Sequence, residues 1–364
     1  MTENKFYFTG EKNVVLVGIK LPDEDSAKIN YSLEELALLA KTLGLSVKDS
    51  FLQNKDKIES NYFIGKGKLE EIKEFIDNND INAILFDRDL SGVQERNIEK
   101  LLGKPVFSRT EIILDIFNKR AVTNEAKLQV KLASLEYMIP RLRNRWGHFS
   151  RVEGGIGLRG GEGEKQLELD RRMVKEDINK IKKKLANVDK QAQNRRKRRH
   201  NGSLVSIVGY TNAGKSSLMN LLSKSNLFVE DMLFATLDST VRKVYINDNL
   251  SILLSDTVGF INNLPHSLVA SFKSTLDDAI DSNLLLHVID ASSSNMQNNI
   301  ASVEKVLEEI SASHIPTIKV YNKIDLLANF DSSLNSNADG VYISVKNKLG
   351  IAELKSKISD FFNN

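Results

Sequence analysis

Eight consecutive residues just past the middle of the chain have the types and spacing needed to hold phosphate groups. Their sequence fits the P-loop pattern G-x-x-x-x-G-K-[ST] at every specified position, after an apolar run and before a helical pattern. Glycines let backbone N–H groups surround phosphate oxygens, the helix N-terminus adds partial positive charge, and Lys215 adds a full charge. Ser216 could bring its hydroxyl to Mg²⁺, and both flanks argue against a chance loop before a helix. The expected phosphate-binding residues are Gly209, Tyr210, Thr211, Asn212, Ala213, Gly214, Lys215 and Ser216.

A second polar motif bears on which base the nucleotide carries. Asp325 follows a β-rich run at 317–321, at the edge of an open α/β sheet where ligands collect. A carboxylate there can accept hydrogen bonds from guanine N1–H and the 2-amino group, and a site left with unpaired polar groups rejects an analogue by roughly 10⁴-fold or more. An isolated N-K-x-D would more readily be a polar turn, but downstream of a P-loop it favours guanine. The motif comprises Asn322, Lys323, Ile324 and Asp325, and a weaker strand-and-loop pattern adds Ser344, Val345 and Lys346 as a cover for the base.

Two segments between these motifs offer groups for Mg²⁺ and the terminal phosphate. A buried-strand pattern ends in D-x-x-G, where Asp256 can hold Mg²⁺ through water and the Gly259 N–H can approach the γ-phosphate because glycine has no side chain. Residues 234–240 lack periodicity, and a threonine hydroxyl there could order the segment around Mg²⁺ and γ-phosphate. Thr236 is the first choice for that hydroxyl and Thr240 the second. The nucleotide contacts expected here are Phe234, Ala235, Thr236, Leu237, Asp238, Asp256, Thr257, Val258 and Gly259; the expected metal ligands are Ser216, Thr236 and Asp256, and the expected catalytic groups are Lys215 and Gly259.

Composition sets the broad class of protein. The chain has 364 residues, enough for two or three domains, with 41% hydrophobic and 27% charged residues, which is ordinary for a globular protein. We expect no membrane span and no secretory signal, because no apolar run approaches the ~18–20 residues required and the N-terminus lacks a basic region before an apolar core. The chain has no cysteine, which excludes disulfides and thiolate metal sites. The net charge of +3 excludes an argument for nucleic-acid binding from bulk charge alone.

The patterns along the chain predict an α/β fold in three parts. Residues 1–120 alternate strand and helix patterns and predict a small N-terminal α/β domain with a partly parallel sheet. A capping-box pattern predicts a helix that opens at Ser32, and Gly65 to Lys68 favours a helix-entry turn over a second phosphate site. Residues 121–200 predict a long helical hairpin with a basic, glycine-rich tip, since apolar residues from Val174 to Ala192 alternate steps of four and three. Residues 201–364 predict the nucleotide domain, with a mostly parallel sheet flanked by helices.

The basic residues of the hairpin leave two interpretations open. Arginines around Trp146 and the run 195–199 could neutralise RNA phosphates, and Trp146 could stack on an unpaired base. They could equally form a solvated helix face and a linker, with Trp146 anchoring the hairpin end in a core. The residues alone do not favour either one.

The four nucleotide motifs, in this order, resemble those of the translation-factor-related GTPases. Further stretches extend the resemblance over nearly the whole chain: NYFIGKGKL at 61–69, RTEIILDIF at 109–117, AKLQVKLA at 126–133, GGIG at 154–157, QLELDRR at 166–172 and DTVGFI at 256–261. Together they resemble the HflX-type ribosome-associated GTPases. The resemblance implies a cytoplasmic, monomeric GTPase that binds Mg²⁺, GTP and GDP, and the large (50S) ribosomal subunit with its 23S rRNA. It also implies the splitting or rescue of stalled or idle ribosomes under stress.

The sequence departs from the family pattern in several places. The tip has RGGEGEK at 159–165 where Arg-Gly-Pro-Gly-Glu-Thr is usual, Ser239 stands where proline is usual, and Val345 replaces an alanine. The chain ends soon after that loop, and we expect no further C-terminal domain of the kind many relatives carry.

The residue after Gly259 bears on the rate of hydrolysis. It is Phe260, where Ras-like proteins have a glutamine that positions water, so we expect slow hydrolysis until the ribosome completes the site. His266 is a possible helper, although a structural histidine is the simpler interpretation. The alternative function is a nucleotide-gated ribosome-assembly or RNA-chaperone module in which hydrolysis is incidental. A tRNA-modification GTPase is a third interpretation, which the lack of cysteine disfavours.

Overall fold

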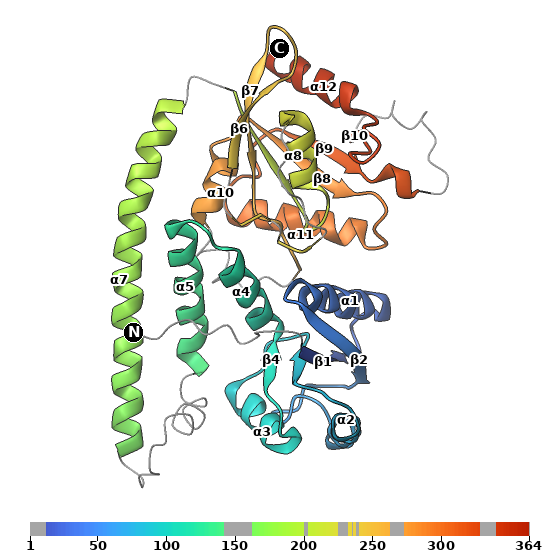
Figure 1. Cartoon of the computed structure of the whole chain (residues 1–364), viewed down its shortest axis with the longest axis vertical. Helices are drawn as coiled ribbons and strands as arrows, with labels where there is room; N and C mark the ends of the chain where they lie inside the picture. Colours follow the sequence, from blue (N-terminus) through green and yellow to red (C-terminus); the bar gives the residue numbers. More distant parts are fainter. Residues whose placement is uncertain are drawn as a thin grey trace. The chain divides into compact units, whose positions relative to one another are not determined.

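The computed structural model describes residues 12–141, 162–199, 203–224, 232–234, 236–237, 240–262, 273–327 and 340–363. The chain divides into two compact units. The first contains the described residues up to Lys119 together with Lys127–Ala186, and the second contains Arg120–Ala126 together with the described residues from Asn187 onward. Each unit is built on its own sheet (Figure 1).

The first unit has a four-stranded sheet in the order β2-β1-β3-β4. Its strands are β1 (Lys12–Lys20), β2 (Leu45–Asn54), β3 (Ala83–Phe86) and β4 (Val106–Ser108), and each pair of neighbours is parallel. β1 and β3 are buried on both faces, as expected for parallel strands covered by crossover helices. One face packs on α2 (Lys66–Asn78) and α3 (Gly92–Leu102), while α1 (Ser26–Thr42) contacts β1 and β2 from the other.

The expected start of α1 at Ser32 is wrong. The helix begins at Ser26, capped by Asp25, whose side chain accepts the Ala27 N–H. Ser32 and Glu35, the two polar members of the expected capping box, instead make tertiary contacts: Ser32 donates to Asp87 at 2.7 Å, and Glu35 pairs with the buried Arg109. The helix-entry turn predicted at Gly65 is confirmed, because Gly65 is the N-cap residue of α2.

The helical pattern after residue 120 forms α5 (Asn124–Met138) and α7 (Glu162–Arg199), with a 3₁₀ turn at Ile139–Arg141 after α5. The two helices pack through a cluster that includes Leu132, Ile178 and Ile181, so this part of the predicted seam faces a partner helix. Trp146 and the glycine-rich tip lie outside the described residues. α4 (Arg109–Arg120) precedes α5 in the chain.

The second unit has a six-stranded sheet in the order β10-β9-β8-β5-β7-β6. The strands are β5 (Leu204–Gly209), β6 (Thr240–Tyr245), β7 (Ser251–Asp256), β8 (Leu284–Asp290), β9 (Thr317–Asn322) and β10 (Gly340–Tyr342). All neighbours are parallel except β6 and β7, so the predicted mostly parallel sheet is confirmed. α8 (Lys215–Ser223) and α12 (Ile351–Asn363) share one apolar core with the sheet.

Helices α10 (Lys273–Ile280) and α11 (Met296–Glu309) cover the opposite face of this sheet (Figure 1). Ser206 of β5 donates to the Asp278 carbonyl of α10, while its neighbours Val205 and Ile207 belong to the core under α8. Alternation along the strand therefore gives β5 helices on both sides. In the described part of the chain, no helix is long and apolar enough to cross a membrane.

Candidate nucleotide site

The phosphate-binding motif occupies the turn between β5 and α8, at the carboxyl edge of the second sheet. The chain leaves β5 at Gly209 and enters α8 at Lys215, and neighbouring strands lie on both sides of β5. This is the position at which open parallel sheets bind ligands. Gly214 has φ +95°, and a Cβ there would lie 2.3 Å from Asn322 Nδ2, so only glycine fits. The packing of β5, α8 and Asn322 thus holds the loop in place.

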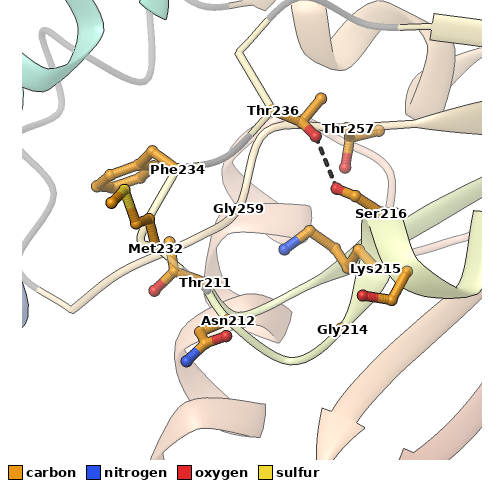
Figure 2. Close-up of a pocket in the computed structure, with 11 residues that line it drawn as sticks. Thr211, Asn212, Gly214, Lys215, Ser216, Met232, Phe234, Thr236, Thr257 and Gly259 are labelled. Carbon is orange, nitrogen blue, oxygen red and sulfur yellow. Dashed lines mark hydrogen bonds between the residues drawn. The ribbon is translucent and has the colours of Figure 1, made fainter. Parts of the chain in front are cut away.

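A pocket opens over this turn (Figure 2). The Lys215 side chain reaches back across the turn, and its Nζ donates to the Tyr210 carbonyl at 2.8 Å. Lys215 is only 6% exposed, and burial lowers its pKa to about 8, an effect that nearby Asp256 opposes. Phosphate oxygens beside this group would favour its charged form. The lining residues are Thr211, Asn212, Gly214, Lys215, Ser216, Ser217, Met232, Phe234, Thr236, Thr257 and Gly259.

Two hydroxyls and one carboxylate meet beside the lysine. Ser216 Oγ lies 2.7 Å from Thr236 Oγ1 (dashed in Figure 2), and both hydroxyls donate to Asp256 Oδ2, at 2.7 and 2.9 Å. Asp256 Oδ1 is buried and has no hydrogen-bond partner among the described residues. Burial raises the pKa of Asp256, whereas Lys215 and the two hydroxyls lower it. Hard oxygen donors with one orphaned carboxylate oxygen fit Mg²⁺, which binds through one or two carboxylates and keeps waters and phosphates as further ligands.

The guanine motif and the loop after β10 form a second cluster on the same edge. Asn322 ends β9; its Nδ2 donates to the Ala213 carbonyl at 2.9 Å, and its Oδ1 accepts the Val345 N–H at 3.1 Å. Asp325 Oδ1 accepts the Ser344 hydroxyl at 2.6 Å. One amide side chain therefore joins the phosphate turn to the loop at 344–346.

The other expected site residues have varied positions. Lys323 has φ +67° and pairs with Asp290 at 2.7 Å, while Ile324 begins a 3₁₀ turn. Thr257 donates its hydroxyl to the Ile207 carbonyl at 2.7 Å. Leu237 and Val258 are buried, and Lys346 is exposed. Ala235 and Asp238 lie outside the described residues, as does His266.

Of the two threonines considered for Mg²⁺, Thr236 lines the pocket. Thr240 instead begins β6 and pairs with Asp256 across the antiparallel ladder. Sequence reasoning missed two lining residues, Ser217 and Met232. Ser217 follows the motif directly in the first turn of α8 and could have been included, whereas nothing in the aperiodic stretch around Met232 pointed to it.

Comparison with known proteins agrees with this geometry. Three family models match successive parts of the chain, described as GTP-binding GTPase N-terminal (residues 30–118), GTP-binding GTPase Middle Region (120–199) and 50S ribosome-binding GTPase (204–323). The chain is 45% identical to GTPase HflX of Caldanaerobacter subterraneus subsp. tengcongensis over 350 residues, which covers 96% of this chain and 80% of that one. The chain belongs to the GTPase HflX family. GTPase HflX of Escherichia coli K12 is 41% identical over 360 residues, covering 97% and 83% of the two chains.

Solved structures place the HflX-type fold among GTP-binding proteins. A GTP-binding protein from Sulfolobus solfataricus in complex with GDP is 25% identical, covers 97% of this chain and 99% of its own, and superposes with a TM-score of 0.51. A complex of SsGBP and GDP is 26% identical over 96% and 98% of the two chains, with a TM-score of 0.55. The predicted family, fold class and GTPase activity are thus confirmed: the chain binds guanine nucleotide and hydrolyses GTP to GDP and phosphate.

Proposed function

We propose that the P-loop residues 209–216 bind the phosphates of GTP and that Lys215 and Gly259 act on the terminal one. Lys215 and Ser216, the first residues of α8, line the pocket, so the helix N-terminus and the lysine side chain both lie at it. Mg²⁺ would be held by Ser216 and Asp256, joined by Thr236, and would neutralise phosphate charge when bound. The buried Asp256 Oδ1 without a partner supports this assignment.

The base is recognised, in this proposal, by Asp325 with the loop at 344–346. The Asp325 carboxylate already accepts the Ser344 hydroxyl through Oδ1, which orients the group and leaves Oδ2 for guanine donors. The Val345 N–H is held by Asn322, so the loop is fixed relative to the phosphate turn. Adenine, which lacks the N1–H and 2-amino donors, would leave Asp325 Oδ2 unpaired.

The ribosome partner and the cellular role are also proposals. HflX-family membership and the match to the 50S ribosome-binding GTPase model support binding to the large ribosomal subunit. We propose further that the contact includes its 23S rRNA and that the protein acts in the cytoplasm as a monomer. Splitting or rescue of stalled ribosomes would be the outcome. We assign the α/β domain to residues 1–120, the hairpin to 121–200 and the GTPase domain to 201–364.

Side-chain contacts hold the end of α5, from which the chain runs on to the proposed docking segment at 142–161. Tyr137, at the end of α5, lies 2.6 Å from Ser108 Oγ and donates to Asp89 at 3.2 Å. Arg141 stacks on the Tyr137 ring at 3.6 Å. The end of α5 is therefore fixed on the first unit.

Phe260 supports slow hydrolysis in the free protein. Its side chain is 3% exposed and offers no group that could orient or deprotonate water. In this proposal the ribosome supplies or assembles the missing group. GTP turnover measured with and without purified 50S subunits tests this, and equal rates would contradict it.

The observation that carries the proposal is the link through Asn322, which joins the phosphate turn to the loop beside Asp325 and supports their assignment to one site. Cosedimentation with 50S subunits, comparing a non-hydrolysable GTP analogue with GDP, tests whether nucleotide controls binding. Equal cosedimentation with the analogue and with GDP would refute nucleotide-controlled binding. Full, repeated activity with the analogue would favour the assembly or RNA-chaperone alternative.

A further inference from the structure

The four residues from Gly259 to Asn262 run alongside the phosphate turn and are bonded to it at three points. The Phe260 N–H donates to the Gly209 carbonyl at 3.1 Å, and the Phe260 carbonyl accepts the Thr211 N–H at 2.7 Å. These two bonds form a parallel bridge between Tyr210 and Phe260. The third bond uses a side chain: the Asn262 N–H donates to the Tyr210 hydroxyl at 2.7 Å.

The Tyr210 side chain is what makes the third bond possible. Tyr210 is only 6% exposed, and its hydroxyl accepts the N–H of the half-buried Asn262. When a partly buried backbone N–H loses its protein acceptor, the segment that carries it is destabilised to the extent that water cannot replace the bond. Phosphate binding by the turn needs only backbone N–H groups at this position, so it does not account for a buried tyrosine hydroxyl.

Asn262 is also tied to a helix on the other side of the segment. Its Oδ1 accepts the Ser302 hydroxyl at 2.6 Å, and Ser302 belongs to α11. The same hydroxyl lies 2.8 Å from the Asn298 carbonyl one helical turn earlier, so its single hydrogen is shared between two acceptors. Asn262 is thus held between the phosphate turn and a helix packed on the sheet.

The position of residues 259–262 matters because Gly259 packs so closely against the phosphate turn that no side chain would fit there. A Cβ on Gly259 would lie 2.9 Å from Lys215 Nζ and 2.9 Å from Thr211 Cγ2. Figure 2 shows Gly259 crossing the pocket beside the Lys215 ammonium. A displacement of about 1 Å at a reacting site can cost on the order of 100-fold in rate.

We propose that Tyr210 and Ser302 are positioning residues which, through Asn262, hold Gly259 against Lys215 for recognition of the γ-phosphate. GDP has no γ-phosphate and does not use this contact. Loss of the clamp should therefore weaken binding of a GTP analogue and slow hydrolysis, and leave GDP affinity nearly unchanged. A structural role alone would instead lower thermal stability and weaken both nucleotides by the same factor.

The test uses the full chain and matched substitutions. Tyr210→Phe keeps the ring and removes the acceptor of the Asn262 N–H, and Tyr245→Phe, on an exposed tyrosine of β6, is the control. Ser302→Ala removes the second contact without touching the P-loop, and Ser302→Thr keeps the hydroxyl. For each variant, affinities for GDP and a non-hydrolysable GTP analogue are measured by calorimetry, together with single-turnover GTP hydrolysis and melting temperature.

We expect Tyr210→Phe and Ser302→Ala each to reduce the preference for the analogue over GDP by about 5- to 20-fold, with a similar fall in the hydrolysis rate. Ser302→Thr should restore the preference, and Tyr245→Phe should leave it unchanged. An unchanged preference in Ser302→Ala and Tyr210→Phe would overturn the proposal, whatever happens to the melting temperature. If Tyr210→Phe does not fold, the serine pair decides alone, since Ser302 is a partly exposed residue of α11.

Discussion

Substituting Asp325 by asparagine should change which base the protein accepts while leaving its fold intact. Asp325 Oδ1 accepts the Ser344 hydroxyl at 2.6 Å, and the carbonyl oxygen of asparagine can accept the same bond. The second oxygen becomes an amide NH₂, which is a donor. Guanine presents two donors to this group, so the variant places donor against donor.

The size of the effect follows from the two bonds lost. A hydrogen bond to a charged group contributes about 1.5–3 kcal/mol, so two of them amount to roughly 3–6 kcal/mol. This corresponds to a Kd for GTP and GDP raised by roughly 10²- to 10⁴-fold. Xanthine carries a carbonyl where guanine carries the 2-amino group, so the variant should bind xanthosine nucleotides better than the parent chain does.

Titration calorimetry with GDP and xanthosine diphosphate measures this directly. Asp248→Asn, on the exposed turn between β6 and β7, is a matched control that removes one charge from the same domain and should bind GDP normally. A melting temperature within a few degrees of the parent would show that Asp325→Asn folds. If that folded variant still bound GDP as the parent does, the assignment of Asp325 to the base would be refuted.

The proposed magnesium ligands, a buried histidine and a buried arginine can each be tested by substitution. Chelation of Mg²⁺ should abolish GTP hydrolysis. Thr236→Ala should raise the Mg²⁺ concentration needed for the half-maximal hydrolysis rate about 10-fold, whereas Thr240→Ala should leave it unchanged. An equal effect of the two substitutions would contradict the choice of Thr236 over Thr240. His287 is buried in β8, and burial, with the charges of Lys319 and Lys215, lowers its pKa to about 4. Between pH 6.5 and 4 this histidine takes up a proton in the unfolded chain but not in the folded one, so the free energy of unfolding should fall by roughly 3 kcal/mol over that range. His287→Leu should flatten the same part of a plot of unfolding free energy against pH. Arg109→Leu leaves the carboxylates of Glu35 and Asp87 buried without that guanidinium and should destabilise the first unit by roughly 3–5 kcal/mol, with GDP affinity unchanged; denaturant melts and calorimetry test both parts.

The nucleotide site could be predicted because each of its motifs is local. Gly214, Asp256 and Asn322 each stand at the end of a strand pattern or the start of a helix pattern, and strand ends of a parallel sheet meet at one edge. The sequence could not show that Asn322 would bond to both Ala213 and Val345, because those contacts join residues more than 100 and more than 20 positions apart.

The start of α1 shows where local patterns mislead. Ser32 and Glu35 have the spacing of a capping box, but both side chains are used by residues 50 or more positions away, Asp87 and Arg109. Leaving the buried arginine without its partner would cost about 3–5 kcal/mol, more than the ~1 kcal/mol of a cap. The pair Tyr210 and Asn262 escaped prediction for a similar reason, since the role of that hydroxyl depends on where the chain returns after β7.

The two hydrogen bonds made by the Asn322 side chain also constrain which substitutions this protein can accept. An amide that supports the phosphate turn with one atom and the base loop with another cannot be altered for the benefit of either alone. A redesign aimed at a new nucleotide should therefore change Asp325, which we assign to the base, and keep Asn322 as it is. Substitution of Asn322 would otherwise weaken binding of the phosphates and of the base together. The variant would then be inactive instead of having a changed nucleotide preference.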